Sequence, residues 1–224
     1  MSRISPLLFH KLGMPDASEH PLFHKHGISE VIEHQKNELR KAVEGLSRVE
    51  LEKDHSELEE KLAAKFNIKV PVVFEDKIEV TEDETQVDSS GDPMQSMPDP
   101  SRPFHVPGFR VTVHIPFEGE GWLFDVQPAA SSLNPPRGRV RGTELLLVRE
   151  VSAERQAALK AEINQDLASV KNCLDCLRPS AQQLASELKQ MAVQEISKRR
   201  QQLASQSELI SSLGFPKRTK RPKK

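Results

Sequence analysis

The stretch RVTVHIPFEGEGWLFDVQP, Arg110–Pro128, decides the fold class because it holds two apolar–polar alternations on either side of a glycine-containing segment. Counted from Phe109, the residue before this stretch, four apolar residues of the first alternation share one side: Phe109, Val111, Val113 and Ile115. This spacing is typical of a strand with one buried face. PFEGEG supplies turn residues and WLFDV resumes the strand pattern, so we expect a β-hairpin with Trp122 in the core.

Two more segments have strand character. VPVVFEDKIEV (Val70–Val80) is rich in β-branched residues and alternates from Phe74 onward, and ELLLVRE (Glu144–Glu150) is apolar on both faces, as in a central strand. Residues 81–107 are rich in acidic residues, Ser, Gly and Pro, which predicts a mobile loop or a short strand around Val87.

Helical patterns lie on both sides of these strands. Ile28–Leu46 has an apolar stripe with Ser29 as N-cap, and a second helix over residues 47–66 begins with a capping box of Ser47 and Glu50. Residues 153–177 then form a nearly heptad seam of Leu159, Ile163, Leu167, Val170, Leu174 and Leu177. Pro179 separates this helix from another over residues 180–203, so we expect a pair of long C-terminal helices.

These patterns predict an α+β fold: a small antiparallel or mixed sheet flanked by an N-terminal helix pair and the C-terminal pair of long helices. We expect an N-terminal segment (1–27), an α+β domain (28–213) and a disordered basic tail (214–224). The apolar segment at the N-terminus is too short for a secretory signal, and no apolar run is long enough to span a membrane. We therefore expect a cytoplasmic location.

The charges are unevenly distributed along the chain. Residues 1–100 hold 12 basic against 21 acidic residues, and the remainder holds 20 against 12. A basic tail can contact phosphates without reading sequence, although such tails are usually solvated. The possible nucleic-acid contacts are Arg137, Arg139, Arg141, Lys217, Arg218, Lys220 and Arg221. Tyr is absent and there is one Trp, which argues against a platform that stacks nucleic-acid bases.

Cysteines and histidines give weak signals for metal binding. Cys173 and Cys176 form a C-x-x-C pair, but no second pair completes a zinc site and the two lie at the end of a predicted helix, so helix packing with reduced thiols is the simpler interpretation. His20, His24 and His26 would meet at a metal only in one particular loop geometry. No metal or cofactor is therefore expected.

Catalytic signals are equally weak. Glu75 and Lys77 have the E-x-K spacing that restriction-type nucleases place on a strand, but no acidic residue of a preceding hairpin supplies the second metal ligand. His105 and His114 stand alone, without a Ser or Cys in a nucleophile elbow. The chain is therefore not expected to be an enzyme.

Several unusual strings carry a family resemblance: VPGFRVTVHIPFEGEGWLFDVQP, SLNPPRG, TELLLVRE and ISKRRQQLASQSELISSLGFPKR. Over roughly residues 20–219 the chain resembles the N-terminal region of uncharacterised bacterial proteins that carry a C-terminal restriction-endonuclease-like domain. In that family the nuclease residues follow the basic linker, so none can be assigned here.

The resemblance implies a non-catalytic accessory or sensor module of a bacterial defence-type system. Such a module would work by protein–protein assembly, with itself or with a companion effector. The alternatives are a sequence-nonspecific DNA-binding module that uses the basic tail and, as the weakest, a metal-dependent nuclease.

Overall fold

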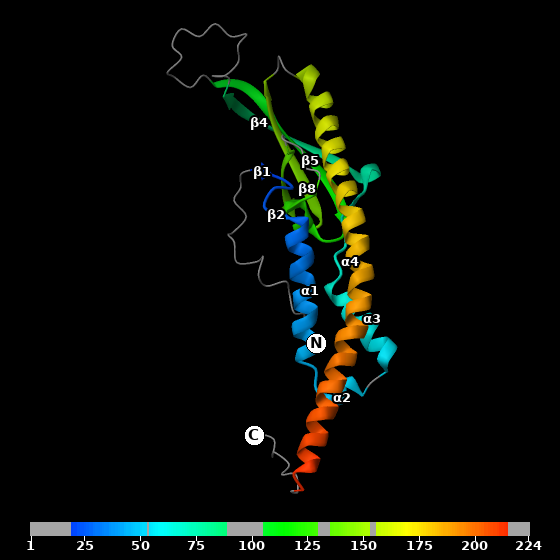
Figure 1. Ribbon diagram of the computed structural model, residues 1–224. Coiled ribbons are helices and arrows are strands. Elements are labelled where there is room, and N and C mark those ends of the chain that lie inside the picture. The colour runs from blue at the N-terminus through cyan, green and yellow to red at the C-terminus, as the bar shows by residue number, and fades with distance from the viewer. Residues whose placement is uncertain (1–18, 53, 89–104, 130–134, 153–155, 215–224) are drawn as a thin grey trace, which may run out of the picture. The chain divides into compact units, whose positions relative to one another are not determined.

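The computed structural model describes residues 19–52, 54–88, 105–129, 135–152 and 156–214. The chain is α+β, as predicted, and divides into two compact units. Unit 1 combines the chain before Ile28 with Val70–Leu177, and unit 2 combines Ile28–Lys69 with the chain from Arg178 onward (Figure 1). Within the described ranges, no helix combines the length and the apolar run that crossing a bilayer requires.

Unit 1 is built on an antiparallel sheet in the order β1-β7-β8-β5-β3, with β4 also paired to β5. Its strands are β1 (His20–Pro21), β3 (Val72–Val73), β4 (Glu79–Asp88), β5 (His105–Glu118), β7 (Arg137–Arg141) and β8 (Glu144–Ser152). A second pairing joins β2 (His26–Gly27) in parallel to β6 (Val126–Gln127). The predicted strand over residues 144–150 is therefore confirmed as β8, which lies between β5 and β7.

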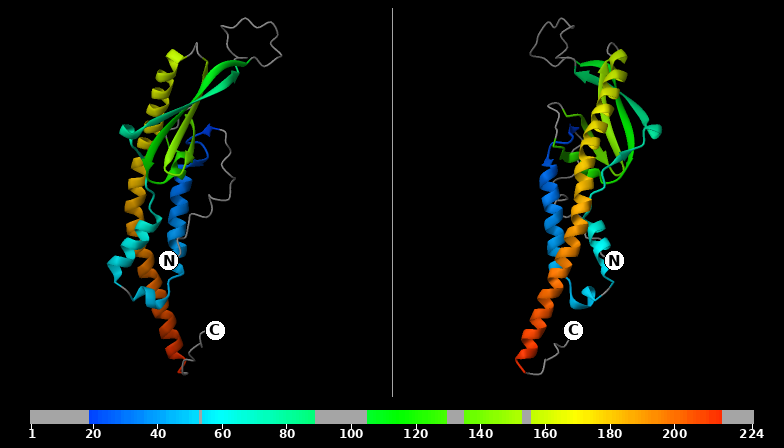
Figure 2. Two further views of the ribbon diagram at one scale, coloured as in Figure 1. Left: turned by 180° about the vertical axis from the view of Figure 1, so that it is seen from behind. Right: turned by 45° about the vertical axis from the view of Figure 1, so that its right-hand side comes forward.

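The predicted alternation in β5 is confirmed by burial. Val113 lies opposite Leu147 of β8 and Ile115 lies opposite Leu145, and all four side chains are buried. The first part of helix α4 (Gln156–Ser212) runs along the sheet in both views of Figure 2. Each fully buried aliphatic side chain stabilises the fold by about 1.5–3 kcal/mol, so this apolar face holds unit 1 together.

The predicted hairpin is wrong after Glu118. Residues 121–125 form a 3₁₀ helix, η2 (Gly121–Asp125), and the following β6 pairs with β2 instead of β5. Gly119 has φ of 120°, a conformation that L-residues with side chains rarely adopt, and it turns the chain away from β5. Leu123 and Phe124 are buried while Trp122 is only half-buried, because a 3₁₀ turn can bury two successive side chains where a strand buries alternate ones.

The predicted continuous strand over residues 70–80 is also wrong. β3 and β4 both pair with β5, but a 3₁₀ helix, η1 (Glu75–Lys77), separates them. From the pair Val73–Phe117 to the pair Glu79–His114, six residue steps on one side match three steps along β5. The three extra residues leave the sheet as η1.

The predicted loop over residues 81–107 is smaller in the structure. Residues 81–88 belong to β4 and residues 105–107 belong to β5, while residues 89–104 lie outside the described ranges. The alternative of a strand near Val87 is correct, and that strand begins as early as Glu79. Thr85 lies opposite Gly108, where a Cβ would come within 2.5 Å of the Val151 carbonyl oxygen, so glycine permits this close approach of strands.

Unit 2 contains α1 (Ile28–Glu44), α2 (Arg48–Leu51), α3 (His55–Phe66) and the second part of α4. The first predicted helix is confirmed as α1, although it starts at Ile28, so Ser29 lies inside its first turn and is not the N-cap. The capping box of Ser47 and Glu50 is confirmed, but it begins the one-turn helix α2. A separate cap, Asp54, then starts α3.

The predicted pair of C-terminal helices is one helix of 57 residues, α4. Pro179 lies inside it, next to the boundary between the two units. A proline costs a helix interior about 3 kcal/mol. Here the stripe of buried side chains continues across it through Leu177, Ala181 and Leu184, and this packing offsets the cost.

Candidate functional site

The last turn of α4 and the residue after it expose a group of large apolar side chains. Leu209, Ile210 and Leu213 are 66%, 44% and 59% exposed. Earlier on the same helix, Arg200 donates to the backbone carbonyl of Leu51 at 2.7 Å, and the backbone carbonyl of Leu203 accepts from Arg48 at 2.8 Å. These contacts fix α4 against α2 just before the exposed group.

Sequence reasoning missed the exposed group because the predicted helix ended at Leu203. The signal that could have found it is the spacing of seven residues from Leu203 to Ile210, which continues the helical pattern.

The three arginines predicted as nucleic-acid contacts share one face of the sheet. Arg137, Arg139 and Arg141 alternate along β7, so their side chains project from the same side. Arg141 lies opposite Glu144 in the strand register, and Arg137 donates to the backbone carbonyl of Glu19 at 3.0 Å. The other predicted contacts, Lys217, Arg218, Lys220 and Arg221, lie outside the described residues.

Carboxylates accompany these arginines on that face. Arg110 of β5 forms an ion pair with Glu150 of β8 at 2.7 Å and lies opposite Asp83 of β4. Carboxylates repel phosphates and compete with them for the arginines. The face therefore carries mixed charge, which is typical of a solvated or protein-contacting surface and unfavourable for a nucleic-acid groove.

The structure corrects the expectation that His114 stands alone. Its Nε2 lies 3.1 Å from Thr81 Oγ1, and its Nδ1 lies 3.4 Å from Glu144 Oε2. The order hydroxyl, imidazole, carboxylate resembles a catalytic triad. However, the side chain of Glu144 is 44% exposed and Thr81 lies exposed on β4, whereas triads work in sites that exclude water. We interpret these contacts as cross-strand hydrogen bonds that join β4, β5 and β8.

The E-x-K pair does not form the geometry of a nuclease strand. Glu75 and Lys77 lie on η1, so their side chains do not share one face of a strand. Glu75 pairs with Lys171 of α4 at 2.7 Å, and Lys77 lies 4.7 Å from the centre of the Phe74 ring. Both residues therefore have structural contacts that explain them.

The predicted weak metal candidates are placed separately. His20 lies 3.5 Å from Asp125, a carboxylate that also pairs with Lys25 at 3.0 Å. Across the ranges that the structure describes, no group of three or more His, Cys, Asp or Glu side chains is arranged to hold a metal ion.

The two cysteines lie within α4, not at the end of a helix as predicted. Cys173 is buried among the packed residues and Cys176 is half-buried, and both are free thiols. Burial raises the pKa of the Cys173 thiol, with a smaller contribution from nearby Cys176. A raised pKa keeps the thiol protonated and unreactive.

An ion cluster that the sequence did not reveal ties three segments of unit 1 together. Arg149 of β8 contacts both Glu19 and Asp166, and the three side chains are about one-fifth exposed. Glu19 also accepts a hydrogen bond from the Val148 backbone N–H. Burial raises the pKa of the Glu19 carboxyl, while that hydrogen bond and the arginine lower it by less. This arrangement fixes the chain before β1 against β8 and α4.

Comparison with known proteins adds no relationship: no family model matches the chain, and no curated protein or solved structure is significantly similar to it. The residues of the chain must therefore carry the functional argument. Among them, the exposed end of α4 is the feature that burial and charge leave least explained within the described part of the chain.

Proposed function

We propose that this chain is a non-catalytic module that works by protein–protein assembly, and that the end of α4 joins it to a second copy. The observation that carries the proposal is the exposure of Leu209 and Ile210 in the last turn of α4 and of Leu213 directly after the helix. Apolar side chains gathered in this way commonly mark a contact surface.

The exposed group continues a buried stripe. Ile196, Leu203 and Ile210 are seven residues apart, so they lie on nearly the same side of α4. Ile196 is fully buried, Leu203 is half-buried and Ile210 is 44% exposed. The apolar stripe thus extends beyond the part of α4 that the rest of unit 2 covers, which supports a role for its end in binding.

The charge of this segment favours self-association. Between Gln201 and Gly214, Glu208 is the one charged residue. Two copies can therefore approach through this segment with little repulsion, and a twofold contact between identical apolar stripes is self-complementary. A nearly neutral segment offers no attraction to phosphates, so this surface suits protein better than nucleic acid.

Mixed charge on the sheet also supports assembly over DNA binding, because Arg110 and Arg141 have carboxylates beside or opposite them. DNA binding through the basic tail remains the alternative proposal. The setting in bacterial defence rests on the family resemblance, and a companion effector would be a second partner in that setting.

The proposal predicts that the wild-type chain dimerises and that the double variant Ile210→Glu/Leu213→Glu is monomeric. Sedimentation velocity up to about 100 µM detects a dimer whose dissociation constant is about that concentration or tighter. The matched control is Ala204→Glu, which adds a charge at an exposed position roughly opposite Leu213 on the helix. A monomeric wild type, or equal dissociation by Ala204→Glu, would refute the proposal.

A further inference from the structure

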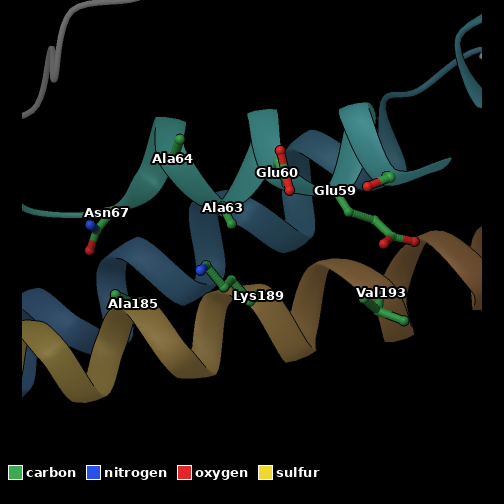
Figure 3. A pocket seen from close by; sticks show the side chains of 9 residues that line it. Glu59, Glu60, Ala63, Ala64, Asn67, Ala185, Lys189 and Val193 are labelled. Atoms are coloured by element: carbon green, nitrogen blue, oxygen red, sulfur yellow. The ribbon is translucent and has the colours of Figure 1, made fainter. Parts of the chain in front are cut away.

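A groove of about 480 Å³ lies within unit 2, between α3 and α4. Figure 3 shows the two helices with the labelled side chains between and beside them. The lining residues are Ser56, Glu59, Glu60, Ala63, Ala64, Asn67, Ala185, Lys189 and Val193. On α4 the groove extends from Ala185 to Val193, which is about 12 Å of helix at 1.5 Å per residue. A groove of this length can hold about two turns of a helix lying along it.

Small side chains make the groove accessible to another helix. Ala63 and Ala64 line it from α3 and Ala185 from α4, while Val193 is 48% exposed at one end. Alanines allow a neighbouring helix to approach closely, as glycine and alanine do at tight helix contacts. In a helical bundle, such a groove between two neighbouring helices is the position that a further helix occupies.

The helix already present, α1, is held by a different set of contacts. Lys36 of α1 pairs with Glu187 of α4 at 2.8 Å and with Glu33 at 2.9 Å. These ion pairs hold Lys36 at 17% exposure. The charges of Lys36 and Glu187 are therefore matched inside the unit.

The charges in the groove are not matched in this way. Glu59, Glu60 and Lys189 form no ion pair or hydrogen bond with any other residue that the structure describes. At the other end, the Asn67 side-chain oxygen is buried without a hydrogen-bond partner among the described residues. Because this oxygen has almost no accessible surface, a partner in the groove does not reach it. Two carboxylates against one ammonium make the groove acidic overall.

We propose that this groove binds an amphipathic helix of a protein partner, one whose contact face combines apolar side chains with Lys or Arg residues that pair with Glu59 and Glu60. The apolar side chains occupy the alanine-lined floor. The groove is separate from the exposed leucines at the end of α4, so the two surfaces can bind different partners.

The test uses a labelled amphipathic helical peptide of Leu and Lys as the probe, with the same pattern of Leu and Glu as its control. Fluorescence anisotropy with the full chain should show binding of the Lys peptide and much weaker binding of the Glu peptide. Glu60→Gln should weaken binding by about two- to fivefold, as expected for loss of one exposed ion pair. Glu57→Gln, at an exposed position on α3 outside the groove lining, is the matched control and should change little.

Ala64→Trp should block the groove without disturbing the core, because Ala64 is exposed. Circular dichroism checks that this variant is folded. Absence of Lys-peptide binding, binding that Ala64→Trp leaves intact, or equal effects of Glu57→Gln and Glu60→Gln would overturn the proposal. If Ala64→Trp abolished a wild-type dimer and Ile210→Glu/Leu213→Glu did not, the groove would bind a second copy, which would also overturn the proposal.

Discussion

Replacing Pro179 by Ala should stabilise the protein, because Pro179 lies inside α4 with an exposed side chain. In a helix interior, proline is about 3 kcal/mol less favourable than alanine. It lacks the N–H that would bond to the carbonyl four residues earlier, and its ring crowds that carbonyl. Alanine also gives the unfolded chain more conformational entropy than proline does, and this reduces the gain in stability by about 0.4–1 kcal/mol. The expected net gain is about 2 kcal/mol, with no buried packing lost.

Thermal unfolding followed by far-UV circular dichroism measures this gain. For a chain of 150–250 residues, 1 kcal/mol shifts Tm by about 2–4 °C, so Pro179→Ala should raise Tm by about 4–8 °C. Ser180→Ala is the control, since it introduces alanine at the next position of the same helix without removing a proline. An unchanged or lower Tm for Pro179→Ala would show that α4 is interrupted there, as the sequence pattern predicts.

Three further predictions concern the core, the ion cluster and the tail. Leu174→Asp should destabilise the protein by several kcal/mol and by more than Leu167→Asp, because Leu174 is 1% exposed and Leu167 is half-buried; similar Tm values for both variants would contradict this. Burial raises the pKa of Glu19, so the stability tied to its protonated form is present at low pH and is lost as pH rises through that raised pKa. Glu19→Gln should therefore flatten the pH dependence of Tm above the ordinary glutamate range, and parallel curves would argue against this origin. A chain ending at Gly214 should keep its Tm and lose any salt-dependent, sequence-independent retention on DNA, whereas a large drop in Tm would show that the tail docks on the body.

Elements with a strong local signal could be predicted from the sequence. The alternation in β5 and the apolar run in β8 identified the two central strands of the sheet. The apolar stripe of α1 and the capping box of Ser47 and Glu50 could also be predicted from residues close together in the sequence. In these elements, the apolar positions of the local pattern point toward the core.

The errors arose where distant pairing overrides the local pattern. Val70–Val80 alternates like one strand, but register with β5 leaves three residues over, which form η1. Trp122 follows a glycine turn of the kind that closes hairpins, yet its segment ends in a strand beside β2, a pairing that local spacing cannot reveal. Pro179 is a strong signal for the end of a helix, but α4 continues through it, with buried apolar side chains on both sides.

Contacts between distant residues also decide which charged groups remain available to a partner. The acidic first half and the basic second half of the sequence suggest a partner of opposite charge, but the fold pairs the two halves with each other. Glu19 meets Arg149, Glu75 meets Lys171 and Lys36 meets Glu187. Part of the charge that the sequence would assign to an outside ligand is thus paired internally. An apolar helix end and the acidic groove beside α3 are two surfaces without such matching in the described part of the chain, and both favour protein partners over nucleic acid.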